Sequence, residues 1–427
     1  MIVDLLYGKS GLPVRFGDDI DVTVIAKPTM PILANPDSAV RRALLAPVES
    51  APLADLAEGK RSACVLICDV TRPVPNSLFL RPMVETLLAA GIDAADITVL
   101  VATGLHRPNL GDELAEVVGD PWVLDRVPVV NHHAEDDAAH VDFGETPTRG
   151  TPVKLDRRFV EADLRIATGL VEPHFMAGYS GGRKVVAPGI AHADTIRTFH
   201  SARFLENPCA VQCRLDGNPL HEEQLEIMRM LGDVYALNTV IDDERRLSFV
   251  NFGEIVASHN EAVVYADRFL TVPVPRRFRT VVTSAAGYPL DQTYYQTVKG
   301  MVTPLDIVGD DATLIVASDC SEGLGSDAFR ASQRRLIDQG ADAFLASLLE
   351  KRFADIDEWE SEMQTKAQRA ARVRMMSRLN DVDRELTGVE PIDSVEEAVR
   401  ESIKVSGDSA VAVIPEGPYV VPRYRPD

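Results

Sequence analysis

Residues 164–191 read LRIATGLVEPHFMAGYSGGRKVVAPGIA, in which an apolar run leads into polar residues and then into a glycine-rich loop. A run that is apolar on both faces is typical of a strand buried in a parallel sheet. Five further runs of this kind alternate with helical patterns and span residues 63–68, 97–104, 280–286, 313–318 and 410–415. The alternation predicts an α/β fold of mostly parallel strands flanked by helices.

The helical patterns between the strands predict the domain organisation. The clearest ones span residues 77–91, 261–270 and 356–380, the last exposed on one side. Prolines and arginines in VPVPRRF (272–278) interrupt the pattern, so we predict a domain boundary there. The chain would then form two α/β domains, residues 1–272 and 273–427, with the active site in the cleft between them. We expect residues 415–427, which contain four prolines, to form an extended tail.

The charge balance bears on the kind of partner. There are 44 Lys and Arg residues against 65 Asp and Glu, a formal net charge of -21. This balance argues against nucleic acid and against anionic membrane surfaces, since both require clustered cations. The N-terminus lacks the pattern of a signal peptide, and no run of about 18 apolar residues occurs. We therefore expect a soluble cytoplasmic protein.

Polar residues with catalytic potential follow three of the predicted strands. Asp69 and Arg72 follow the first, His106 follows the second, and Glu172 and His174 follow the third. In open α/β sheets, ligands bind outside the carboxyl ends of the strands. These positions together predict a functional site.

The chemistry of these side chains suggests their roles. His106 and His174 suit a reaction that needs a base on each face of a substrate. Asp69 can orient a histidine ring, although it also fits a turn or helix cap. Arg72 can bind a carboxylate with two hydrogen bonds, although it also fits a surface ion pair.

The other histidines and cysteines are expected to be structural. Three histidines lie in or next to the acidic segment AEDDAAHVD (134–142) and are predicted to be solvated: His132, His133 and His140. His221 and His259 fit ordinary helices. Cys209 and Cys213 are interpreted as buried thiols rather than zinc ligands, since no second pair follows at zinc-finger spacing.

The glycine loop at 178–184 matches the pattern G-x-S-x-G around Ser180. A nucleophile elbow needs a helix directly after the serine, and the residues after this loop do not predict one. A P-loop needs Ser or Thr after its lysine, whereas Val185 follows Lys184. The loop still brings backbone N–H groups and two cations together, which suits one phosphate.

A second polar cluster lies beyond the predicted boundary. YPLDQTYYQTVKG (288–300) has helical spacing from about Asp291. Tyr295, Gln296 and Lys299 fall on one face of that helix. The face is either solvated or directed at the strand-end residues, in which case the site would lie between the domains.

Together these motifs resemble those of the nickel-dependent lactate racemase family. The resemblance rests on motifs that occur in the family's order from about residue 60 to 360. They are CDVTRPVPN (68–76), TGLHRP (103–108), EPHFMAGYSGGRKVVAPGIA (172–191), FH (199–200), GYPLDQTYYQTVKG (287–300) and Trp359. The twenty residues from Glu172 are the most specific.

The resemblance implies a nickel-pincer nucleotide, a pyridinium-3-thioamide-5-thiocarboxylate mononucleotide that holds nickel through sulfur, carbon and sulfur. It implies that the cofactor is attached to Lys184 and that His200 completes the square plane of the nickel, a geometry that suits Ni(II). Gly181, Gly182 and Tyr179 would contact the nucleotide. Lys184 must react as a neutral amine, so a neighbouring cation such as Arg183 would help by lowering its pKa.

The resemblance also implies an activity, the racemisation of lactate or a related short-chain 2-hydroxy acid. Hydride transfer to and from the cofactor would pass through a 2-keto acid. His106 and His174 would be the acid and base, supported by Asp69. Arg72 and Lys299 would hold the substrate carboxylate, and the remaining members of the pocket would be Gln296, Tyr295 and Trp359.

Cofactor-synthesis proteins would be partners. The alternatives are an epimerase or racemase of a larger 2-hydroxy acid, a non-catalytic cofactor-binding homologue and a serine hydrolase acting through Ser180.

Overall fold

A computed structural model describes residues 1–426, and its contacts divide the chain into two compact units. Unit 1 comprises Met1–Pro28, His200–Glu206 and Phe269–Asp427, and unit 2 comprises Thr29–Phe199 and Asn207–Arg268. The chain thus passes into its C-terminal part at residues 268 and 269, close to the predicted boundary.

Two earlier segments join unit 1 rather than the N-terminal part of the chain. Met1–Pro28 does so because β3 (Asp21–Val24) pairs with β19 (Ala410–Ile414). His200–Glu206 does so because α9 (Ala202–Leu205) packs against helices of that unit. His200, which we expected within the domain of residues 1–272, therefore belongs to unit 1.

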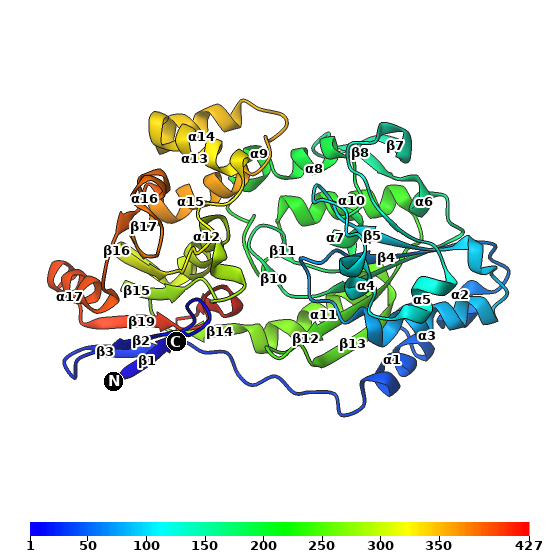
Figure 1. The fold of residues 1–427 in the computed structure, drawn as a ribbon, viewed down its shortest axis with the longest axis horizontal. Coiled ribbons are helices and arrows are strands. Elements are labelled where there is room, and N and C mark those ends of the chain that lie inside the picture. Colours follow the sequence, from blue (N-terminus) through cyan, green and yellow to red (C-terminus); the bar gives the residue numbers. More distant parts are fainter. Residues whose placement is uncertain (427) are drawn as a thin grey trace. The chain divides into compact units, whose positions relative to one another are not determined.

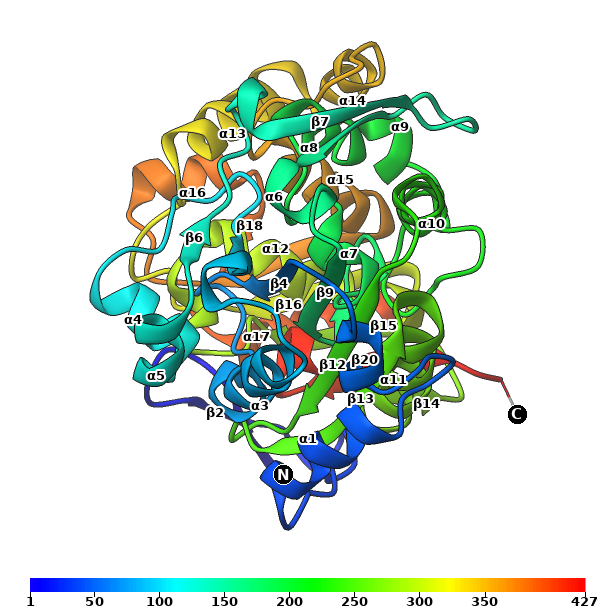
Figure 2. The same cartoon turned by 90° about the vertical axis from the view of Figure 1, so that its right-hand side faces the viewer.

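The main sheet of unit 2 has the strand order β13-β12-β9-β4-β5-β6. All neighbouring strands are parallel except β12 and β13. The strands are β4 (Ala63–Cys68), β5 (Ile97–Ala102), β6 (Val129–Asn131), β9 (Leu164–Leu170), β12 (Tyr235–Ile241) and β13 (Leu247–Glu254). Two small hairpins accompany them: β7–β8 (His140–Glu145, Pro152–Asp156), at the top of Figure 2, and β10–β11 (Pro173–His174, Gly178–Tyr179).

Helices cover both faces of this sheet (Figure 1). Val65 and Ile67 point toward α1 and α3, where they join a fully buried apolar core. α7 and α10 lie on the opposite side. The helices of unit 2 are α1 (Pro36–Leu45), α2 (Leu53–Ala57), α3 (Asn76–Ala89), α4 (Asp112–Val118), α5 (Pro121–Arg126), α6 (Arg157–Val160), α7 (Arg183–Val186), α8 (Ala193–Phe199), α10 (Pro219–Leu231) and α11 (Ile255–Leu270).

The main sheet of unit 1 is parallel throughout, with the order β18-β17-β16-β15-β19-β3. Its other strands are β15 (Phe278–Ser284), β16 (Val308–Ala317), β17 (Ala371–Met376) and β18 (Glu390–Pro391). The hairpin of β1 (Ile2–Leu5) and β2 (Leu12–Arg15) packs with α17 (Val395–Ser406) on one face. The other face carries α12 (Tyr294–Val302), α13 (Asp327–Gln339), α15 (Glu358–Ala370) and α16 (Asp381–Thr387), with α14 (Ala341–Leu349) beside α13 (Figure 1).

The predicted fold class is confirmed: both units are built from mostly parallel strands flanked by helices. Among residues 1–426, no helix has the length and apolar character needed to cross a membrane.

Three predictions about segments of unit 1 are wrong. The helix predicted over 356–380 ends at Ala370, and the next six residues form the strand β17 inside the sheet. The helix is also buried on nearly all sides, because the sheet and α12 and α13 surround it. The expected tail contains β20 (Val421–Tyr424), which pairs with β14 (Thr271–Val274) in the expected linker, so both segments are ordered by backbone hydrogen bonds.

Candidate functional site

The carboxyl ends of three neighbouring strands bring the predicted residues of unit 2 together. β4 lies between β5 and β9 in the sheet, so the residues that follow these strands meet at one edge. Asp69 follows β4 directly, and its Oδ2 lies 2.6 Å from Nδ1 of His106, which follows β5. The Asp69 side chain is 5% exposed, whereas that of His106 is 61% exposed. The pair thus has a buried carboxylate and an accessible imidazole.

The surroundings of Asp69 keep it ionised. Burial alone would raise the pKa of this carboxyl, but hydrogen bonds from His106 and Thr71 and the charge of Arg72 outweigh burial and lower it. The hydroxyl of Thr71 donates to Asp69 Oδ1 over 2.6 Å. An ionised Asp69 accepts the Nδ1 proton of His106, which leaves Nε2 of a neutral His106 as the basic atom.

Arg72 is held by an ion pair with Glu172. Burial alone would lower the pKa of Arg72, but the charges of Glu172 and Asp69 and the hydrogen bond to Glu172 together outweigh burial and raise it. The side chains are 34% and 29% exposed, so a ligand can reach the guanidinium without the pair being dismantled. The ion-pair alternative for Arg72 is therefore observed, and its remaining N–H groups are consistent with carboxylate binding.

His174 presents a different nitrogen arrangement from His106. Its Nδ1 accepts hydrogen bonds from the backbone N–H groups of Met176 and Ala177, at 3.3 and 3.2 Å. A neutral His174 in this geometry carries its proton on Nε2. It is therefore set as a donor, and it must release these contacts before Nδ1 takes the proton instead.

Lys184 lies in α7, after the glycine loop, and is half-buried. Burial lowers the pKa of its ammonium group to about 7, and the charges of Arg72 and Arg183 add to the effect. A lysine with this pKa is substantially neutral near pH 7 and can act as a nucleophile. The expected contribution of Arg183 is present, and that of Arg72 is larger.

The glycine loop is shaped by close packing. Gly181 has φ +76, and a Cβ there would lie 2.7 Å from Val171; Gly182 has φ +49, and a Cβ there would lie 2.8 Å from the His259 ring. Among the described residues, the hydrogen bonds include none donated by the N–H groups of Gly181 and Gly182. Both residues are buried, so these two N–H groups lack an acceptor within the described part of the chain.

The context of Ser180 excludes the serine-nucleophile alternative. Its hydroxyl is buried and donates to the carbonyl of Leu170 over 2.7 Å, so it fastens the loop to the end of β9. The prediction that no helix begins after the loop is wrong, because Arg183–Val186 forms the single helical turn α7. That turn is too short for the helix of a nucleophile elbow.

The sequence did not predict that Arg183 is buried or that it contacts two histidines. Arg183 is fully buried; its Nε donates to Nδ1 of His221 over 2.7 Å and its Nη1 lies 2.9 Å from Nε2 of His259. Burial lowers the pKa of Arg183 to about 9 and, with the Arg183 charge, that of His221 to about 3. The two histidines are thus neutral supports for the loop, and they lie in helices as predicted, in α10 and α11. The only sequence signal was their helical context, which does not identify a partner.

Tyr179, predicted to contact the nucleotide, is buried. Its hydroxyl donates to Asp267 of α11 over 2.5 Å. Burial, with Cys213 and Asp267 nearby, raises the pKa of Tyr179. Its observed contact therefore anchors the β10–β11 hairpin to α11.

In unit 1, three of the predicted residues contact one another in series. The rings of His200 and Trp359 have centroids 4.7 Å apart, and the Trp359 indole N–H donates to the Tyr295 hydroxyl over 3.1 Å. Tyr295 lies in the first turn of α12, and Trp359 lies in the first turn of α15, which packs against α12. The neighbouring Lys299 donates to the side-chain oxygen of Gln296, so the predicted helix face is built as expected.

The acidic segment differs from its prediction. His132 is buried and contacts Asp156 Oδ2 and the Ala191 carbonyl, each at 3.0 Å. His140 is also buried, edge-on to the rings of His132 and His192. Only His133 is exposed, because the β7–β8 hairpin and the segment after it cover the others. These histidines are structural.

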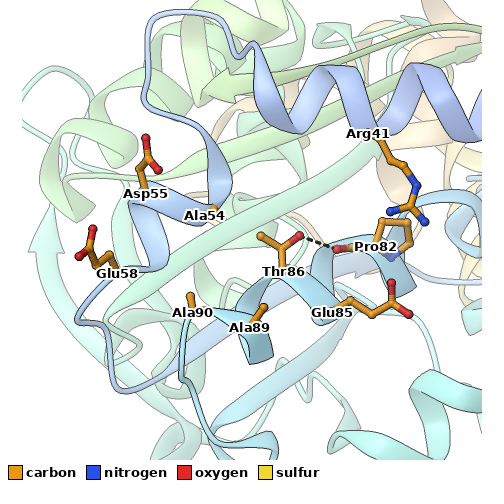
Figure 3. Close-up of a pocket in the computed structure, with 9 residues that line it drawn as sticks. All are labelled: Arg41, Ala54, Asp55, Glu58, Pro82, Glu85, Thr86, Ala89 and Ala90. Atoms are coloured by element: carbon orange, nitrogen blue, oxygen red, sulfur yellow. Dashed lines mark hydrogen bonds between the residues drawn. The ribbon is translucent and has the colours of Figure 1, made fainter.

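Two further features bear on ligand binding. A surface pocket between α1, α2 and α3 (Figure 3) contains none of the predicted site residues; Arg41, Asp55, Glu58 and Glu85 supply its charged groups. Within residues 1–426, no three His, Cys, Asp or Glu side chains are grouped so that they could hold a metal ion. Cys209 and Cys213 are half-buried and outside any disulfide. A metal at His200 would need donors from a cofactor.

The chain is similar to known lactate racemases over nearly its whole length. The family model described as the lactate racemase N-terminal domain matches residues 7–212, and that of the lactate racemase C-terminal domain matches residues 276–421. A lactate racemase of Thermoanaerobacterium thermosaccharolyticum is 29% identical over 441 residues, covering 99% of each chain. A lactate racemase of Lactiplantibacillus plantarum is 30% identical over 421 residues, covering 97% of this chain and 98% of the relative.

Solved structures show the same similarity. The lactate racemase apoprotein from T. thermosaccharolyticum superposes with a TM-score of 0.90 at 28% identity, covering 99% of this chain and all of that one. A Thermotoga maritima protein shares the fold, with a TM-score of 0.68 at 17% identity, covering 93% of this chain and all of that one.

Proposed function

The chain belongs to the lactate racemase family, and from this premise we propose that it interconverts the enantiomers of lactate or a related short-chain 2-hydroxy acid. The observation that carries the proposal is the group formed by the Asp69–His106 pair, Arg72 and the low-pKa Lys184 at adjacent strand ends. It combines a base, a carboxylate binder and an attachment point for a cofactor.

His106 takes the hydroxyl proton from one enantiomer of the substrate. Nε2 is the accepting atom, because Asp69 accepts the Nδ1 proton. The ionised Asp69 then stabilises the imidazolium that forms. Proton transfer by a positioned group of this kind contributes about 10²–10⁴ in rate.

His174 serves the opposite enantiomer. Its resting geometry offers Nε2–H as a hydrogen-bond donor to the substrate oxygen. To accept a proton at Nε2, the ring shifts its own proton to Nδ1 and gives up two long backbone contacts. The difference between the two histidines thus predisposes His106 to act as the base first.

The substrate carboxylate binds to Arg72 and Lys299. Arg72 keeps its ion pair with Glu172 and offers its other N–H groups. Lys299 adds a point charge, and Gln296, Tyr295 and Trp359 line its surroundings. These groups fix the carboxylate and hydroxyl that all 2-hydroxy acids share, so they support the reaction class rather than one side chain.

The residues present fit a nickel-pincer nucleotide. Lys184 suits covalent attachment because its amine is substantially neutral near pH 7, and the free N–H groups of Gly181 and Gly182 suit the nucleotide phosphate. His200, oriented against Trp359, would be the single nickel ligand from the chain. When bound, the cofactor would supply the acceptor for the C2 hydride, a step that no side chain can perform.

A chiral assay tests the proposed function. Protein loaded with the cofactor by the synthesis proteins is incubated with single enantiomers of lactate, 2-hydroxybutyrate, phenyllactate and malate, and product enantiomers are separated by chiral chromatography. We expect lactate or 2-hydroxybutyrate to approach a 1:1 mixture fastest. Loaded protein that leaves every acid enantiopure would overturn the proposal, and faster turnover of phenyllactate or malate would assign a larger substrate.

A further inference from the structure

Helix α15 carries three buried carboxylates, and one of them is unlike the others. Glu358 is paired with Arg335 and Lys351, at 2.9 and 2.7 Å. Glu362 lies among the charges of Glu206 and Lys366. Glu360 is fully buried, and within residues 1–426 neither of its carboxylate oxygens has a hydrogen-bond partner. A native structure rarely leaves such a group unsatisfied without a functional reason.

The groups around Glu360 are those proposed to hold the substrate. It follows Trp359, whose indole donates to Tyr295. The charge of Lys299 stabilises the ionised form of Glu360. Burial raises the pKa of Tyr295, and the charge of Glu360 raises it further. Glu360 thus borders the Lys299–Tyr295 face of α12 from the side of α15.

Other charged groups near α15 are engaged elsewhere. Asp357, just before the helix, accepts a hydrogen bond from Ser326 and repels Glu360. From α13, Arg335 pairs with Glu358, and next to α9, Glu206 pairs with Arg369. β16 and β17 pack on the helix through apolar residues, and the His200 ring packs on Trp359. Lys299 is therefore the cation that acts on Glu360.

The protonation state of Glu360 is balanced near neutral pH. Burial raises the pKa of its carboxyl to about 8, although the Lys299 charge opposes the shift. Above that pH, the charge of Lys299 stabilises the ionised Glu360. Below it, the neutral acid carries an O–H group that can donate a hydrogen bond.

We propose that Glu360 is a substrate-positioning residue that takes up a proton when the carboxylate of a 2-hydroxy acid binds at Lys299. This inference rests on the proposed function and extends it to the binding step. Two carboxylates beside one ammonium group cannot both stay ionised at low cost, so the incoming carboxylate favours the protonated form of Glu360. The protonated acid then donates its O–H to the bound anion, which satisfies the buried carboxyl.

The sign of the pH dependence follows from this linkage. Below about pH 8, Glu360 already holds its proton, and substrate affinity does not depend on its titration. Above that pH, binding must bring a proton, so affinity falls by up to roughly tenfold per pH unit.

Kinetics of the loaded enzyme test the inference. The KM for lactate is measured from pH 6.5 to 9.5 in the parent and in Glu360→Gln, with Glu362→Gln as a matched buried-acid control. We expect the KM of the parent and the control to rise about five- to tenfold between pH 8.5 and 9.5. The KM of Glu360→Gln should stay near its own value at pH 7, because glutamine cannot titrate. A KM rise of equal steepness in Glu360→Gln would overturn the inference.

A binding measurement separates this inference from the proposed function and needs no variant at Glu360. The analogue 2-hydroxy-2-methylpropanoate has the carboxylate and hydroxyl but no C2 hydrogen, so it binds without turnover. Trp122→Phe leaves Trp359 as the only tryptophan, whose fluorescence reports binding.

We expect close to one proton taken up per analogue bound at pH 9 and close to none at pH 6.5, measured with an indicator in weak buffer. Equal uptake at both pH values, or no binding, would overturn the inference. Linked uptake in a protein that racemises no acid would support it and refute the racemase proposal.

Discussion

Lys184 is half-buried and lies near two guanidinium groups, those of Arg72 and Arg183. These surroundings lower its pKa to about 7, so its amine is available at neutral pH. We predict that Lys184→Ala abolishes covalent attachment of the cofactor when the chain is expressed with the synthesis proteins. Intact-mass spectrometry measures the adduct. Lys60→Ala, which removes an exposed lysine, is the control and should carry the full adduct. An adduct of parent stoichiometry on Lys184→Ala would refute the assignment.

His221 contributes to the pH dependence of the free energy of unfolding. Burial and the Arg183 charge lower its folded-state pKa to about 3, against an ordinary value of 6.5. The unfolded chain therefore binds more protons between these values, and stability falls as pH falls through that window. The loss approaches 1.4 kcal/mol per pH unit.

We predict that His221→Asn, which keeps an acceptor for Arg183 but cannot titrate, reduces the loss of urea stability between pH 6.5 and 4.5. The exposed His133→Asn is the control and should follow the parent. A variant at 221 that loses stability as steeply as the control would contradict the account of this cluster.

At the scale of elements, the turn formed by Gly181, Gly182 and α7 positions Lys184. Gly182 has φ +49, and any Cβ there meets the His259 ring at 2.8–2.9 Å. Gly59 has a similar positive φ of +71 but open space around it, which makes it a matched control.

We predict that Gly182→Ala costs about 1–3 kcal/mol more than Gly59→Ala, because overpacking adds to backbone strain. The thermal unfolding midpoint and the fraction of chains carrying the cofactor measure the effect, and both should be lower for Gly182→Ala. Equal values in the two variants would show that the loop tolerates a side chain against His259.

The sequence predicted elements well where apolar patterning is unambiguous. The runs at β4, β5 and β9 were located because they are apolar on both faces, and their order in the sheet explains why His106 meets Asp69. β17 was missed because ARVRMM follows α15 without glycine or proline, so its pattern continues the helix. Tertiary pairing with β16 decides its conformation.

The sequence did not reveal the burial of α15 or the contacts of Arg183 beneath the glycine loop. Glu358, Glu360 and Glu362 indicate an exposed face by composition, yet all three are buried in the fold. The contacts of Arg183 with His221 and His259 join residues 38 and 76 positions apart, and no local pattern encodes them. The predicted site residues lie in compact motifs, and those of unit 2 follow strand ends, which is why the sequence could single them out.

At the scale of the whole molecule, each of the two units carries part of the proposed chemistry. Unit 2 provides the proton-transfer pair and Lys184. Unit 1 provides the Lys299–Gln296 pair and the contacts of Trp359 with His200 and Tyr295. The net charge of -21 makes such local cations the groups that hold an anionic substrate. Racemisation through a 2-keto acid requires that the hydrogen leaving C2 returns to C2.

The fate of that hydrogen is the most direct test of the proposed racemisation. Loaded protein is incubated with one enantiomer of C2-deuterated lactate in ordinary water, and the opposite enantiomer is isolated and analysed by mass spectrometry and proton NMR. We expect the product to retain its C2 deuterium, because hydride leaves and returns without exchange with solvent. Product lactate with protium at C2 would contradict hydride transfer and indicate that the histidines remove the C2 proton directly.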